Sequence, residues 1–89
     1  MEENLKKQWR EARTDLIISI GKQLGIERDD QILMMMCLNT PEKIMKFSNW
    51  TKTKMPDNET VKAIPEQVVS AATRIGRGME PLPDEAYQK

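Results

Sequence analysis

Seven consecutive apolar residues, from Ile32 to Leu38, interrupt an otherwise mixed pattern of polar and apolar positions. An apolar run of this length does not fix its own period, so a buried strand is the alternative to a helix. Three Met, two Leu and one Cys with a single β-branched residue favour the helix. Because a helix that is apolar all round must be covered on nearly every side, we predict a central helix over Ile32–Leu38, enclosed by amphipathic helices.

The chain before this run has the pattern of an amphipathic helix from about Glu3 to Gln23. Its outer face is polar apart from Ile18, and Ile17 lies at the margin of the apolar face. Gly25 is a natural left-handed terminator, and Ile26 is placed to fold back against the helix. The apolar face, with residues at steps of three and four, consists of Leu5, Trp9, Ala12, Leu16, Ile20 and Leu24.

Capping residues and prolines divide the rest of the chain. Asp29 or Asp30 is expected to cap the central helix. Thr40 is expected to cap a helix that runs from Pro41 to about Lys54, because proline costs nothing at the first helical position. The remaining expected elements are a turn at Met55–Asn58, a short helical turn at Thr60–Ala63 and a last helix from Pro65 to about Ile75.

The ten C-terminal residues, 80–89, contain two prolines and no helical periodicity. We expect them to be extended or mobile unless they dock on the rest of the chain. Eighty-nine residues suit one domain. The predicted fold is therefore all-α, a small bundle of about four short helices over residues 1–79, followed by the tail at 80–89.

Composition and charge set limits on the partners. The 14 basic and 14 acidic residues cancel, so the chain as a whole has no attraction for nucleic acid or an anionic membrane. No run approaches the roughly 18 apolar residues that span a bilayer, and Met1–Gln8 lacks the apolar core of a secretory signal. The single cysteine, Cys37, is expected to be a reduced, buried thiol. We expect a cytosolic protein that does not enter membranes.

Catalytic and metal chemistry find little support. The chain has no histidine, which removes the commonest general base and the commonest neutral metal ligand. It has no glycine-rich phosphate loop, and Glu27, Asp29 and Asp30 lack the spacing of a calcium loop. We therefore expect no enzyme, no catalytic residue, no metal and no cofactor.

The predicted helix at 41–54 carries the arrangement that bears most on binding. Residues 31–55 hold four lysines against one acid, which makes this third of the chain +3 and the remainder −3. A tryptophan flanked by lysines can anchor an acidic protein partner, or stack on a base while the ammonium groups meet phosphate. Alternatively, the tryptophan packs against its own domain and the lysine stems lie across it. The residues that share this side of the helix are Lys43, Lys46, Trp50 and Lys54.

The three successive methionines, Met34–Met36, point about 100° apart and cannot all face one neighbour. We expect them to fill the core; an adaptable binding surface and the seam of a homodimer are the alternatives. The function that these observations favour is a small cytosolic, non-catalytic interaction module, such as an adaptor, a regulatory subunit or an inhibitor of a larger protein assembly. The alternative is a DNA- or RNA-associated accessory protein that uses the basic face of the helix at 41–54.

Overall fold

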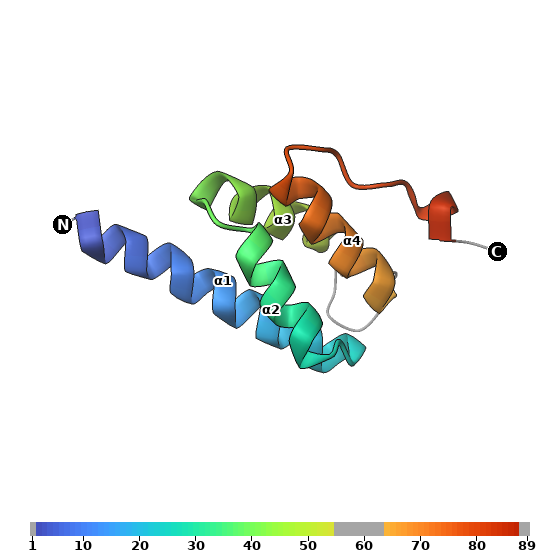
Figure 1. Cartoon of the computed structure of the whole chain (residues 1–89), viewed down its shortest axis with the longest axis horizontal. Coiled ribbons are helices and arrows are strands. Elements are labelled where there is room, and N and C mark those ends of the chain that lie inside the picture. Colours follow the sequence, from blue (N-terminus) through green and yellow to red (C-terminus); the bar gives the residue numbers. More distant parts are fainter. Residues whose placement is uncertain (1, 55–63, 88–89) are drawn as a thin grey trace.

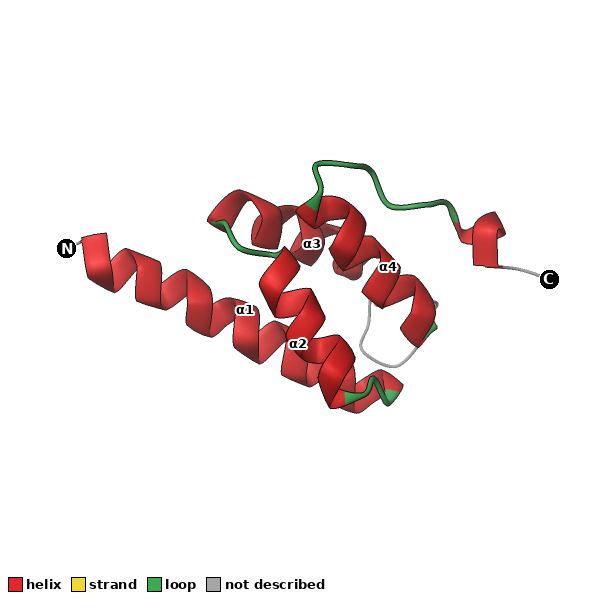
Figure 2. Cartoon of the chain, viewed as in Figure 1, coloured by secondary structure: helices red, strands yellow, loops and turns green. Residues whose placement is uncertain are grey.

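The computed structural model describes residues 2–54 and 64–87, with side chains from residue 7 onward. Within those residues the chain is helical and contains no strand (Figure 2). This confirms the predicted all-α bundle of about four helices. The predicted turn at Met55–Asn58 and the predicted helical turn at Thr60–Ala63 lie outside the described residues. The elements are α1 (Glu2–Leu24), α2 (Arg28–Cys37), α3 (Pro41–Lys54), α4 (Pro65–Gly76) and the 3-10 turn η1 (Asp84–Tyr87).

Helix α2 lies between α1 and α4, and α3 packs on α4 and α1 (Figure 1). The N-terminal half of α1 extends past the other helices (Figure 1). Buried apolar side chains from all four helices meet in one core, which Trp50, Leu16, Leu24, Met35 and Val69 adjoin. The core residues are Ile17, Ile20, Ile26, Met34, Leu38, Ile44, Phe47, Val68, Ala71, Ala72 and Ile75.

The apolar face of α1 is placed slightly differently from the prediction. Ile17, which the pattern put at the margin, is completely buried, whereas Ala12 is exposed. The neighbouring helices cover the C-terminal half of α1, so the buried stripe is centred on Ile17 and Ile20. Ile18 is exposed on the polar side, as its position indicated.

The predicted helix boundaries depend on local signals, and most of them are confirmed. Gly25 has a φ of 71°, and the Ile26 N–H donates to the carbonyl oxygen of Gly21 at 3.0 Å, which ends α1. Thr40 Oγ1 accepts from the backbone N–H of Lys43 at 3.3 Å, as expected of a cap.

The predicted cap of α2 is wrong, because α2 begins at Arg28 and its N-cap residue is Glu27, which makes no side-chain cap hydrogen bond. Asp29 and Asp30 instead lie in the first turn. Carboxylates are favourable there because they meet the positive end of the helix dipole. The two aspartates therefore support the first turn by charge, and α2 begins before them, earlier than the sequence pattern suggested.

The expectation that the central apolar helix is enclosed on nearly every side is wrong. Met34 and Leu38 are fully buried, but three large apolar side chains remain substantially exposed: Ile32 (45%), Leu33 (42%) and Met36 (69%). Helices α1 and α4 cover two sides of α2, and α3 packs elsewhere in the bundle, so the third side is open to solvent. Met34 is fully buried and Met35 half-buried, so the expected methionine-rich core is reduced to these two.

None of the helices in residues 2–54 and 64–87 is both long and apolar enough to cross a bilayer.

Candidate functional site

The basic face of α3, which we define as Lys43, Lys46, Trp50 and Lys54, lies beside the buried stripe of the same helix. Ile44, Phe47 and Thr51 point into the core and fix the rotation of α3. This leaves the predicted binding residues on the sides of the helix that are not fully buried. All four occur on one continuous helix, as the sequence predicted, and each has a partner within the chain.

Trp50 is half-buried and held against the core. Its ring stacks on that of Phe47, with ring centroids 6.0 Å apart and an interplanar angle of 18°. Lys54 Nζ lies 5.8 Å from the centroid of the Trp50 ring, within the range of a cation–π contact. Of the three arrangements considered for this tryptophan, the observed one has Trp50 packed on its own domain with a lysine across it.

The described part of the C-terminal tail, residues 80–87, lies along this face, and its first polar contact involves Glu80. The carboxylate of Glu80 accepts from Lys46 Nζ at 2.6 Å. The backbone carbonyl of the same residue accepts from Arg74 Nε of α4 at 2.7 Å. Glu80 therefore bridges α3 and α4 through two different acceptor groups.

Asp84 makes the second and more enclosed contact. One of its carboxylate oxygens accepts from Lys54 Nζ at 2.5 Å and from Gln67 Nε2 at 2.7 Å. The hydrogen bond from Lys54, followed by that from Gln67, lowers the pKa of Asp84 below its ordinary value of 3.8. Further along, Tyr87 Oη donates to Ser70 Oγ of α4 at 2.6 Å. The sequence left open whether the tail docks on the rest of the chain. Residues 80–87 do so, through contacts with α3 and α4.

Sequence reasoning found the lysines and missed the acids that pair with two of them. Glu80 and Asp84 were assigned to a tail without periodicity, and they lie 34 and 30 residues from Lys46 and Lys54. The available signal was electrostatic. The segment at 31–55 has a net charge of +3, and the tail at 80–89 has three acids against one lysine, so the two segments attract each other.

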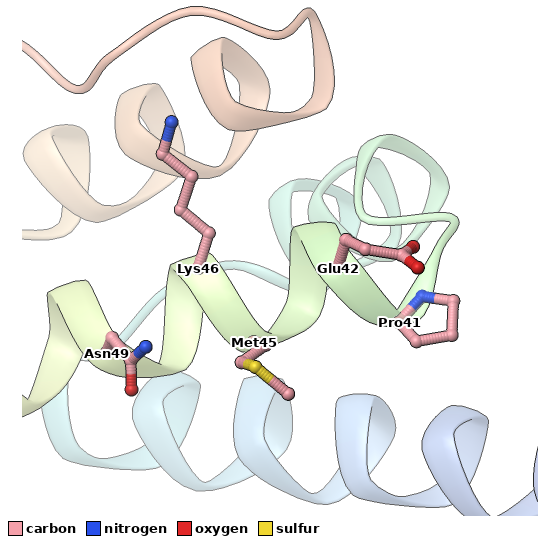
Figure 3. Close-up of a pocket in the computed structure, with 5 residues that line it drawn as sticks. All are labelled: Pro41, Glu42, Met45, Lys46 and Asn49. Carbon is pink, nitrogen blue, oxygen red and sulfur yellow. The ribbon is translucent and has the colours of Figure 1, made fainter.

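A shallow depression of about 330 Å³ adjoins Lys46 on α3 (Figure 3). Figure 3 shows Lys46 extending toward α4 and the tail, while Met45 and Asn49 lie on the other side of the helix. Met45 is among the exposed large apolar residues. The basic face is therefore bordered by an apolar contact area, lined by Pro41, Glu42, Met45, Lys46 and Asn49.

A second depression, of about 520 Å³, lies between α2 and α4 and includes Leu33 and Val69 in its lining. Leu33 belongs to the exposed side of α2 that also carries Ile32 and Met36. The sequence analysis considered an uncovered methionine surface on this helix as an alternative to core filling. The structure places Met36, but neither Met34 nor Met35, among the exposed large side chains.

Potential metal ligands and the single cysteine can be located among the described residues. No three His, Cys, Asp or Glu side chains among those residues gather where they could hold a metal ion. Cys37 is half-buried at the end of α2, and Gly76 of α4 packs closely against it.

The described surface thus combines the basic face of α3, the tail docked on it and two neighbouring apolar areas. Comparisons with protein-family models, with curated proteins and with solved structures found no match to this chain.

Proposed function

We propose that this chain is a small, cytosolic, non-catalytic interaction module that binds a protein partner through the basic face of α3. The observation that carries the proposal is the pairing of Lys46 with Glu80 and of Lys54 with Asp84. A face that holds two carboxylates of one peptide segment has the chemistry to hold the carboxylates of another.

The environment of Trp50 supports a role in recognition. Its stacking on Phe47 restricts the indole, so little conformational entropy remains to be lost when a partner binds. Tryptophan is enriched among residues that dominate binding energy. Met45 and the depression beside Lys46 add apolar surface at the border of the charged groups.

The alternative partner is nucleic acid, and two observations make it the weaker candidate. Phe47 lies nearly parallel to the Trp50 ring and occupies one side on which a base would stack. Glu80 and Asp84 also reduce the positive potential of two lysines that phosphates would have to meet.

The test compares two doubly substituted full-length chains with the same change in charge. Lys46→Glu with Lys54→Glu alters the basic face, whereas Lys22→Glu with Lys52→Glu alters exposed lysines of α1 and α3. Circular dichroism first shows that each variant has the same helical content as the wild type. The wild type and each variant are then immobilised and used to capture proteins from the native host. We expect the first variant to lose a partner that both the wild type and the second variant retain. Retention by all three would contradict the proposal.

A separate titration with duplex and single-stranded oligonucleotides, at two salt concentrations, tests the alternative. Phosphate contacts weaken steeply as the salt concentration rises. Binding at low salt that disappears both at high salt and in the Lys46→Glu, Lys54→Glu variant would favour nucleic acid over protein.

A further inference from the structure

We infer that the surface formed by Lys46 and Lys54 of α3 with Gln67 and Arg74 of α4 recognises an extended acidic segment, and that the chain's own tail at 80–87 occupies this surface as an internal competitor of the partner. The inference rests on the proposed function and adds to it the chemical class of the ligand and the way in which access is regulated. It depends on the spacing of the charges, on the donors that α3 and α4 present and on the exposure of the Glu80 contact that holds the tail.

The two lysines of α3 and the two acids of the tail have matching spacing. Lys46 and Lys54 are eight residues apart on a helix, which at 1.5 Å per residue separates them by about 12 Å along the axis. Glu80 and Asp84 are four residues apart, with Pro81 and Pro83 between them. In the extended conformation that proline favours, four residues span about 12 Å. The two ion pairs can therefore form together without distortion of either segment.

Side chains of α3 and α4 present hydrogen-bond donors, and the tail presents acceptors. Gln67 of α4 is 4% exposed, and its Nε2 donates to the same oxygen of Asp84 that Lys54 contacts. Arg74 of α4 donates to the backbone carbonyl of Glu80. Four side chains of two helices, Lys46, Lys54, Gln67 and Arg74, thus converge on acceptors of a five-residue segment. The ligand that fits has two carboxylates separated by three residues in an extended, proline-containing stretch.

The tail is held by contacts that a competing segment can replace. The Glu80 side chain is 81% exposed, and pairs between exposed charged groups contribute little to stability. Asp84 and Tyr87 make more enclosed contacts, and covalent attachment keeps the tail at a high effective concentration near this surface. A partner with the same charge spacing and additional contacts, for example with Met45, can displace it.

The experiment uses a fluorescein-labelled peptide with the sequence of residues 79–87, Met-Glu-Pro-Leu-Pro-Asp-Glu-Ala-Tyr, and measures its binding by anisotropy. The full-length chain is compared with a full-length variant carrying Glu80→Gln and Asp84→Asn, which neutralises the two anchoring acids of the tail. A control variant carries Glu11→Gln and Asp15→Asn, which remove two exposed acids of α1. A control peptide has lysine in place of both anchoring acids.

We expect the tail variant to bind the acidic peptide at least about tenfold more tightly than the wild type, because the internal competitor is weakened. The Glu11→Gln, Asp15→Asn control should bind like the wild type. Adding Lys46→Glu and Lys54→Glu to the tail variant should abolish binding of the acidic peptide and permit binding of the lysine peptide.

If the wild type and the tail variant bind the peptide with equal affinity, the tail is not an internal competitor. The inference that the ligand is an acidic segment would then be retained. No binding to either, with a protein partner still captured through Lys46 and Lys54, would overturn the ligand class but not the proposed function. If both the peptide and the partner fail to bind, the proposed function itself fails. A wild-type dimer that the tail substitutions dissociate would place the tail on α3 and α4 of a second copy and overturn the intramolecular arrangement.

Discussion

Arg13 of α1 donates from Nη1 to the backbone carbonyl oxygen of Met35 at 3.1 Å and thereby ties the last turn of α2 to α1. The same nitrogen lies 3.4 Å from the carbonyl oxygen of Leu38. The last carbonyls of a helix lack intrahelical partners and carry the negative end of its dipole, so a guanidinium is well suited to this position. The end of α2 is thus stabilised by a residue more than twenty positions earlier in the sequence.

Replacing Arg13 by methionine should lower the free energy of unfolding by about 1–2 kcal/mol, because a charge-assisted hydrogen bond to partly buried carbonyls is lost. Arg10→Met is the matched control. Both guanidinium groups lie over the Trp9 ring, at 5.2 Å for Arg13 and 5.7 Å for Arg10, but Arg10 is exposed. Urea unfolding should show a change within about 0.5 kcal/mol for the control. Equal losses would assign the effect to Trp9 instead of to the end of α2.

Gly76→Ala should destabilise the protein, although the same change within a helix normally stabilises it. A Cβ at Gly76 would lie 2.7 Å from the carbonyl oxygen of Cys37 and 2.8 Å from its Cβ, so α4 and α2 would have to separate. We expect a loss of about 1–3 kcal/mol, the usual cost of overpacking, in thermal or urea unfolding.

Gly21→Ala provides the comparison for Gly76. A Cβ at Gly21 would meet the end of the Gln31 side chain, a flexible group that can move at the cost of its 2.9 Å hydrogen bond to the Ile26 carbonyl. Its loss should therefore be smaller than that at Gly76. The reverse order would contradict the close packing of α4 against the end of α2.

Met34→Ala and Met36→Ala should differ strongly although the two residues are two positions apart. Met34 is fully buried, so its truncation leaves a cavity and should cost about 2–5 kcal/mol of unfolding free energy. Met36 is 69% exposed, and its truncation should change stability by no more than about 0.5 kcal/mol. Comparable losses in urea unfolding would mean that Met36 is covered in solution, for example by a second copy of the chain.

Docking of the tail should depend on acid pH through Asp84. Hydrogen bonds from Lys54 and Gln67 lower the pKa of Asp84, so the charged carboxylate favours the docked state. This contribution is complete above the ordinary value of 3.8 and is lost as the pH falls through the lowered pKa. An NMR titration of the Asp84 carboxyl group should therefore give a midpoint below 3.8.

Lys54→Met should move this midpoint upward, because the largest cause of the lowered pKa is removed. Lys52→Met, which changes an exposed lysine of the same helix, should leave it in place. An unchanged midpoint in Lys54→Met would show that the pair with Asp84 does not persist in solution.

The sequence by itself determined the helices and most of their ends. Gly25 ends α1, and Thr40 with Pro41 begins α3, because these residues act through hydrogen bonds and dihedral preferences within a few positions. The periodicity of the apolar residues also identified most of the core faces, and the clustering of lysines with Trp50 along one helix followed from helical geometry alone.

Only the tertiary structure decided which sides of α2 are buried and what lies on the basic face of α3. An apolar run shows that cover is needed, but the placement of the other helices decides where it is found, and here Ile32, Leu33 and Met36 remain open. Glu80 and Asp84 reach their lysines across 34 and 30 residues of sequence. No local pattern encodes such pairs, since they form only after α3 and α4 have packed and brought together the side chains that the tail contacts.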